Sequence, residues 1–171
     1  MQLNCANLSK NGYICIVKSG VYLSYWQPYD DTKTATSMKL SFRIHKRSDL
    51  VFDYLTDMQK FVSVHPVISK IDNIGHERFL VHETLKFGFI PFSFTYPVTI
   101  EKNILDKKVV IRATVFKLTK IEMEFVLKTD NDFTIIEEEI MFKSPLPVKF
   151  IMESIFKKQH DQLFKNIEMN P

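Results

Sequence analysis

The stretch that decides the fold is the last quarter of the chain. Residues 133–142 have the sequence FTIIEEEIMF, residues 143–147 have KSPLP, and residues 148–169 have VKFIMESIFKKQHDQLFKNIEM. The first segment alternates apolar and polar side chains, which is typical of a half-buried β-strand. The last spaces its apolar residues as a long amphipathic helix does. A long helix after an unbroken series of strands indicates a curved antiparallel sheet that grips one helix, with an apolar cleft between them.

The preceding chain carries further strand patterns and two short helices. Ser48 provides a hydroxyl to cap the first helix, and His65 before Pro66 ends the second. The connections between the later strands are short, which makes neighbouring strands antiparallel. We therefore expect an α+β fold, with a curved seven-stranded antiparallel sheet around the C-terminal helix and two short helices after the first strand. The other expected strands are residues 38–44, 68–74, 77–87, 92–104, 108–116 and 119–129.

Length and composition describe one globular domain with its own core. The chain has 171 residues, of which 45% are hydrophobic and 25% charged, and this is the balance of an ordinary folded domain. The chain contains fifteen Phe but only one Trp and four Gly. Such an excess of Phe either fills a core or builds an apolar pocket with smooth walls.

Several classes of function are not indicated. The net charge is +3 and the basic residues are scattered, so nucleic acid is not an expected partner. Cys5 and Cys15 have neither metal-ligand nor redox spacing, which makes a reduced, cytoplasmic location the default. No apolar run approaches the roughly 20 residues of a membrane span. The motifs of zinc hydrolases, phosphate-binding loops and nucleophile elbows are missing, so no metal and no cofactor is expected.

The first part of the chain differs from the rest in composition and in its lack of a regular strand pattern. Asn and Gly punctuate residues 1–37, and residues 30–37 form a polar run that resembles a linker. The strand pattern becomes regular only at Met38. We expect residues 1–37 to be an appendage with little regular order and residues 38–171 to be the functional domain. The alternative is that residues 1–37 contribute an ordinary N-terminal strand.

Two carboxylates lie on apolar strand faces. Glu83 lies between Val81 and Leu85 on the inward side of the strand 77–87. Burial would raise its pKa, and this makes Glu83 the first candidate for a ligand anchor or a general acid or base. Glu138 has a similar position in the strand 133–142. The alternatives are a structural salt bridge for Glu83 and a solvated face for Glu138.

Other side chains are expected to complete a ligand site. Tyr96 offers a hydroxyl to a bound carbonyl, unless it only packs. Gln159 occupies the centre of the apolar stripe of the C-terminal helix, where a helix facing a dry core would carry Leu. The apolar wall is expected to include Phe94, Ala113, Met123 and Met152.

From Met38 onward the chain resembles the superfamily that unites START lipid-transfer domains, birch-pollen-allergen-like proteins and bacterial polyketide cyclases, called SRPBCC, with its helix-grip fold. The resemblance rests on the order of elements and on residues 48–58, 61–66 and 156–167. It implies an elongated cavity between sheet and helix for sterols, lipids, polyketides or other hydrophobic molecules. It also places the loop at His65 near the cavity entrance. The first 37 residues depart from the family's pattern.

These observations favour the binding or transport of a hydrophobic small molecule over two alternatives. The first alternative is a cyclase or dehydratase in which a cavity carboxylate moves protons. The second is an interaction module that docks a protein partner or a membrane surface through Phe150 and Phe164, which we expect on the side of the helix away from its stripe.

Overall fold

A computed structural model describes residues 4–7, 13–16, 35–87, 89–145 and 149–170. The chain divides into two compact units, Met1–Thr34 and Ala35–Pro171. The first unit contains an antiparallel pair of strands, β1 (Asn4–Asn7) and β2 (Tyr13–Ile16). The expected lack of order in residues 1–37 falls mostly outside the described residues.

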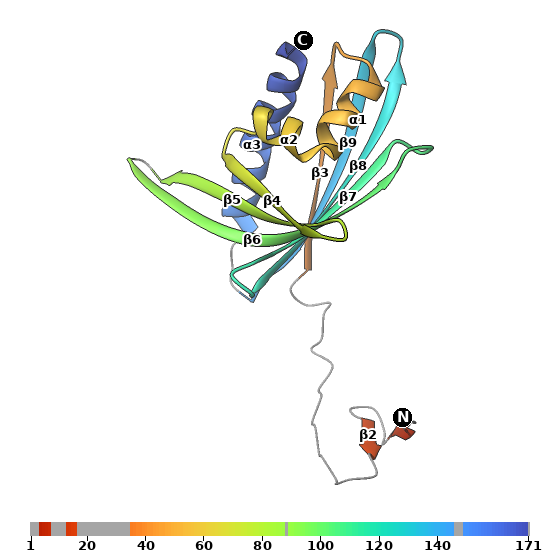
Figure 1. Ribbon diagram of the computed structural model, residues 1–171, viewed down its shortest axis with the longest axis vertical. Helices are drawn as coiled ribbons and strands as arrows, with labels where there is room; N and C mark the ends of the chain where they lie inside the picture. Colours follow the sequence, from red (N-terminus) through yellow and green to blue (C-terminus); the bar gives the residue numbers. More distant parts are fainter. Residues whose placement is uncertain (1–3, 8–12, 17–34, 88, 146–148, 171) are drawn as a thin grey trace. The chain divides into compact units, whose positions relative to one another are not determined.

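The second unit is built on one curved antiparallel sheet (Figure 1). Its seven strands have the order β3-β9-β8-β7-β6-β5-β4, so that only the pairing of β3 with β9 joins strands distant in sequence. This confirms the predicted fold class. The strands are β3 (Ala35–Ile44), β4 (Ile68–Gly75), β5 (Arg78–Phe87), β6 (Ile90–Asn103), β7 (Lys108–Val115), β8 (Thr119–Asp130) and β9 (Phe133–Lys143).

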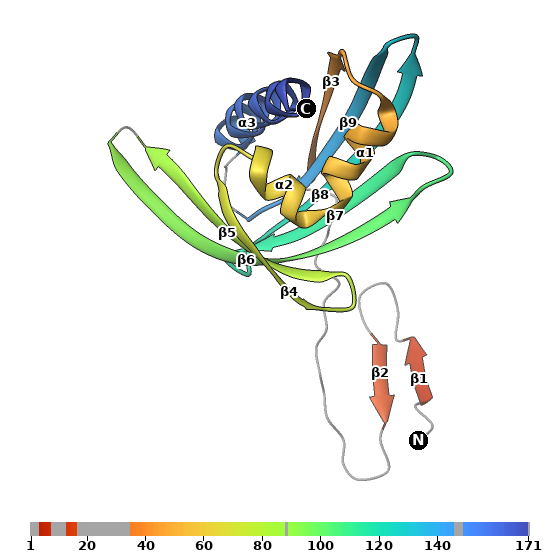
Figure 2. The same ribbon diagram turned by 45° about the horizontal axis from the view of Figure 1, so that its top comes forward.

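Three helices lie on the concave side of this sheet (Figure 2). The short helices α1 (Ser48–Thr56) and α2 (Met58–Val64) connect β3 to β4, which lie at opposite edges of the sheet. The long helix α3 (Lys149–Met169) follows β9 and ends the chain. Among the described residues, no helix is both long enough and apolar enough to span a membrane.

A side chain caps the start of α2 but not the start of α1. The cap of α1 is Arg47, which makes no side-chain capping bond, and the Ser48 hydroxyl lies 3.0 Å from Thr129 Oγ1. The expected cap is therefore wrong, because the hydroxyl bonds a neighbouring strand instead. Asp57 caps α2, since its carboxylate accepts from the backbone N–H groups of Gln59 and Lys60 at 2.9 and 3.2 Å.

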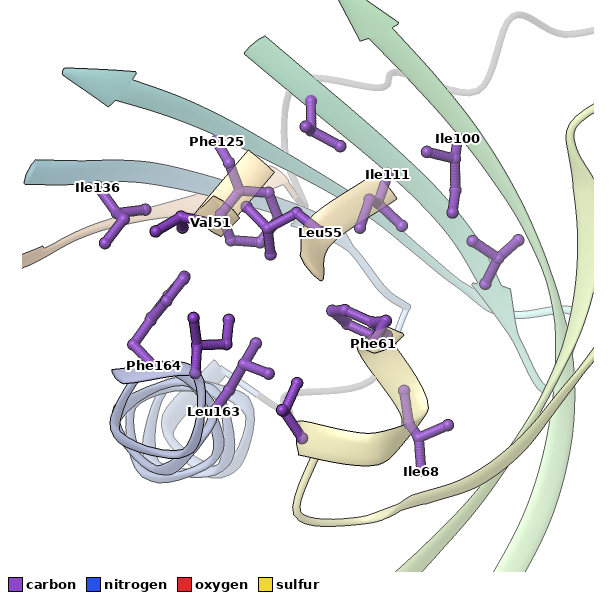
Figure 3. Close-up of a cluster of buried hydrophobic side chains, with 14 of the residues drawn as sticks. Val51, Leu55, Phe61, Ile68, Ile100, Ile111, Phe125, Ile136, Leu163 and Phe164 are labelled. Atoms are coloured by element: carbon purple, nitrogen blue, oxygen red, sulfur yellow. The ribbon is translucent and has the colours of Figure 1, made fainter. Parts of the chain in front are cut away.

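The buried apolar side chains form one cluster, and the least exposed of them lie in one half of the unit, which we call the packed half. It brings α1 and the C-terminal part of α3 against β3, β8 and β9 (Figure 3). Its most deeply buried side chains include Val51, Leu55, Phe125, Ile136, Ile140, Leu163, Phe164 and Ile167.

Phe164 belongs to this core and is not on the surface. It is 1% exposed, and its ring lies 4.6 Å from that of Phe42 and 6.3 Å from that of Phe125. The expectation of an exposed Phe164 is wrong because α3 contacts both β3 and α2. Two adjacent faces of the helix are therefore buried, rather than one narrow stripe. Phe150 is 81% exposed, as expected.

Candidate ligand-binding site

The other half of the unit encloses a cavity of about 300 Å³. Its walls are the concave faces of β4 to β8, the helix α2 and the N-terminal part of α3. The side chains that line it are almost all apolar, because the inward positions of β5, β6 and β7 carry Phe, Val, Leu, Ile and Ala. The alternation visible in the sequence thus produces an apolar wall.

Most of the residues predicted for the site meet around this cavity. The lining includes His65, Glu83, Phe94, Tyr96, Ala113, Met123, Met152 and Gln159. Glu138 lies on the inward face of β9, as the alternation predicts, but it does not line the cavity.

Glu83 and Tyr96 form the first polar pair of the site. The Tyr96 hydroxyl donates to Glu83 Oε2 over 2.6 Å, and Glu83 is 8% exposed. Burial raises the pKa of Glu83, and hydrogen bonds from Tyr96 and Gln159 and the charge of His160 oppose part of that rise. Burial and the neighbouring Glu83 raise the pKa of Tyr96 well above its ordinary value. An apolar ligand with one polar group would find a donor and an acceptor here.

Glu138 and His160 form a second polar pair. His160 Nδ1 lies 2.7 Å from Oε1 and 2.8 Å from Oε2 of Glu138, and the hydrogen-bond geometry favours Oε2. Both residues are almost fully buried, and Glu138 Oε1 has no hydrogen-bond partner within the described ranges. His160 lines the cavity while Glu138 does not. Glu138 therefore affects the site only through the imidazole of His160, which it orients.

Sequence reasoning missed His160 although a signal was present. His160 lies four residues from both Phe156 and Phe164, and all three are buried. Residues four positions apart share one face of a helix. An apolar stripe drawn through the two Phe residues would have placed the imidazole on the inward side of the helix.

His65 closes the loop at the end of α2 and also lines the cavity. Its Nδ1 accepts from the backbone N–H groups of Val67 and Ile68 at 3.4 and 3.2 Å, and its ring packs against Phe61. Burial, with a smaller contribution from His160, lowers the pKa of His65 to about 3. Protonation would also remove the acceptor that holds the loop.

This arrangement predicts a loss of stability in acid. Between the ordinary His pKa of 6.5 and the folded value of about 3, the unfolded chain binds a proton that the folded chain does not, so stability falls as the pH falls. We expect His65→Asn to reduce this loss by up to roughly 1.4 kcal/mol per pH unit below 6.5. Asn keeps an acceptor for the loop but does not titrate. Urea unfolding of both proteins between pH 5 and 7 measures the difference, and parallel pH profiles would contradict it.

A metal centre is not formed by the part of the chain that the structure describes, where no three His, Cys, Asp or Glu side chains converge. The polar groups of the cavity are instead suited to hydrogen bonding and proton exchange.

Comparison with known proteins identifies the fold. No protein-family model matches the sequence, and no curated protein matches it. Solved structures do match. A START superfamily protein from Mycobacterium smegmatis aligns with a TM-score of 0.64 at 11% identity, over 77% of this chain and 94% of that one. The ZhuI aromatase/cyclase from Streptomyces sp. R1128 aligns with a TM-score of 0.60 at 12% identity, over 78% and 91%.

A third match is a norcoclaurine synthase variant from Thalictrum flavum in complex with a transition-state analogue. It has a TM-score of 0.57 at 12% identity, over 78% of this chain and 94% of that one. The chain therefore has the helix-grip fold of START, birch-pollen-allergen-like and polyketide cyclase proteins, and the resemblance expected from the sequence is confirmed at the level of the fold. The fold includes enzymes as well as proteins not described as enzymes.

Proposed function

We propose that the protein binds or transports a hydrophobic small molecule of lipid, sterol, polyketide or aromatic type in the cavity between sheet and α3. The observation that carries the proposal is an apolar cavity with the bonded pair of Glu83 and Tyr96 on its wall. Burial of the ligand's apolar surface supplies the affinity, at about 25 cal/mol per Å² removed from water. The polar pair orients the one polar group of the ligand.

The size of the cavity supports this proposal. Small-molecule pockets in proteins typically measure about 300–1,000 Å³ and are lined mostly by apolar side chains. The cavity of about 300 Å³ is at the lower end of this range and has such a lining. A hollow of this size is better explained by a ligand that fills it than by imperfect packing.

Native mass spectrometry of protein purified without detergent tests the proposal directly. We expect either a co-purified hydrophobic molecule or saturable binding of an apolar fluorescent probe that such a molecule displaces. Binding that never saturates, with no co-purified mass, would contradict a ligand cavity.

Substitution of Glu83 tests its role as an anchor. Gln keeps the shape and most of the hydrogen-bonding capacity of Glu but cannot exchange a proton near neutral pH. We expect Glu83→Gln to keep ligand affinity within roughly tenfold, or about 1.4 kcal/mol. Glu83→Leu should weaken ligands with a polar group more than purely apolar ones. Titration of a matched pair, such as a long-chain alcohol and the corresponding alkane, measures this. Equal affinities in all three proteins would remove Glu83 from the site.

A second candidate function, a cyclase- or dehydratase-like proton transfer, is favoured by the pair of Glu138 and His160. A carboxylate that fixes an imidazole at an apolar cavity is the arrangement of a general base. Turnover of a co-purified compound that persists in Glu83→Gln and disappears in His160→Gln would identify His160 as that base. Loss of turnover in Glu83→Gln would instead identify the carboxyl group of Glu83 as the general base. Genes for polyketide or aromatic biosynthesis next to this gene would also favour an enzyme.

A further inference from the structure

Six large apolar side chains are exposed at one end of the second unit. We call them the apolar rim: Phe89, Ile90, Phe116, Leu118, Phe150 and Ile151. Their exposed fractions run from 56% to 105%. They come from the β5–β6 turn, the β7–β8 turn and the start of α3, three segments far apart in sequence. Scattered apolar side chains are normal on a surface, whereas a group of this size marks an interaction site.

The sheet topology gathers these segments at one end. In an antiparallel sheet, the β5–β6 turn, the β7–β8 turn and the exit of β9 toward α3 all lie at the same end of the strands. Figures 1 and 2 show the two hairpin turns and the start of α3 on the same side of the unit. The rings of Phe92 and Phe116 lie 6.1 Å apart and link the two hairpins.

The rim is also the mouth of the cavity. Phe116 and Ile151 line the cavity as well as being exposed. From Phe116, ring contacts continue to Phe94 at 5.1 Å and from Phe94 to Tyr96 at 5.7 Å. A continuous aromatic wall therefore leads from the surface to the hydroxyl that bonds Glu83.

Exposed lysines flank the rim on the two hairpins. Residues 84–93 and 114–120 contain Lys86, Lys117 and Lys120 but no Asp or Glu, whereas the first turns of α3 carry Glu153 as well as Lys149. Lys86, Lys117 and Lys120 are exposed. Positive charge around exposed apolar side chains complements a surface that is negative outside and apolar inside.

We propose that the apolar rim docks on an anionic lipid bilayer and that the cavity takes up and releases its ligand there. The rim side chains enter the boundary between headgroups and acyl chains, and the lysines face the lipid phosphates. A protein partner fits less well, because protein interfaces are depleted in Lys, whereas Lys86, Lys117 and Lys120 are exposed beside the rim. This inference rests on the proposed function, since a docked mouth matters only if the cavity holds a ligand.

Flotation of the full chain with lipid vesicles tests the inference. We expect binding to vesicles of phosphatidylcholine with phosphatidylglycerol, much weaker binding to phosphatidylcholine alone, and a decline with rising salt. Phe89→Ser combined with Phe150→Ser should reduce binding at least tenfold. The matched control is Ile104→Ser combined with Leu105→Ser, because both side chains are exposed in the β6–β7 turn at the other end of the sheet. It should bind as the original chain does.

The charge contribution needs its own variants. Lys86→Glu combined with Lys117→Glu should abolish the preference for anionic vesicles without changing the fold. Equal vesicle binding by the rim and control variants, or no binding to either vesicle, would overturn the inference. Sedimentation that shows a dimer of the original chain but a monomer of the rim variant would also overturn it, in favour of a second copy on the rim.

The failure of this inference can be distinguished from failure of the proposed function. The rim variant should keep its affinity for an apolar fluorescent probe in solution within about twofold, because Phe89 and Phe150 do not line the cavity. Probe binding without vesicle binding would leave the ligand cavity standing and remove the docking surface. Vesicle binding without probe binding would support the docking surface and contradict the ligand cavity.

Discussion

Ala113→Trp is expected to abolish the binding of an apolar fluorescent probe while the protein remains folded. Ala113 is 5% exposed and is the smallest inward side chain of β7 at the cavity. In a filled core an added indole would force neighbours out of place and destabilise the protein. Here it enters a space of about 300 Å³ and occupies the room that a ligand needs. A probe titration, with circular dichroism and thermal unfolding as measures of the fold, checks both parts.

The neighbouring residue provides the matched control. Thr114 follows Ala113 on the same strand, so its side chain points to the opposite, convex face of the sheet. Thr114→Trp adds the same indole outside the cavity and should leave probe affinity unchanged. A folded Ala113→Trp protein that keeps the original affinity would show that the probe does not bind between sheet and α3.

The largest expected effect on stability comes from removing one partner of the buried pair of Glu138 and His160. We expect His160→Leu to destabilise the protein by about 1–3 kcal/mol, because it leaves the buried carboxyl group of Glu138 without its hydrogen-bond partner. Glu138→Leu leaves Nδ1 of His160 without its hydrogen-bond partner and should also destabilise the protein. Urea unfolding at pH 7 measures both changes.

The double variant Glu138→Leu with His160→Leu separates pairing from packing. Replacing both partners of a buried hydrogen bond by apolar side chains can be nearly neutral or stabilising, so the double variant should be more stable than His160→Leu alone. The exposed pair of Asp161 and Lys165, 2.7 Å apart, is the control, and Asp161→Ala should change stability by less than about 1 kcal/mol. Purely additive effects of the two Leu substitutions would contradict a coupled pair.

The sequence predicted the strands well because strand periodicity is local. The expected strand 133–142 corresponds to β9 at Phe133–Lys143, and the expected helix 148–169 corresponds to α3 at Lys149–Met169. Alternation along a strand also assigns each side chain to a face, which is how Glu83 and Tyr96 were placed on one wall. Neither result requires knowledge of a distant segment.

The errors concern contacts between distant segments. Phe164 is buried against rings of β3 and β8, and His160 is buried against side chains of β8 and β9. Nothing in the helix sequence indicates which neighbours the helix will meet. Glu138 was correctly assigned to the inward face, but His160 stands between it and the cavity. Ser48 is a residue type that often caps helices, but its hydroxyl forms a hydrogen bond with Thr129 instead. Local patterns predict faces, whereas distances across the fold depend on tertiary packing.

The division between a packed half and a hollow half has an evolutionary consequence. Leu55, Ile136 and Leu163 hold the fold together in the packed half and contribute nothing to the cavity wall. Substitutions in the wall, such as those at Phe94 or Leu85, change the shape of the cavity while leaving that core intact. Selection can therefore alter the ligand of such a domain with little loss of foldability.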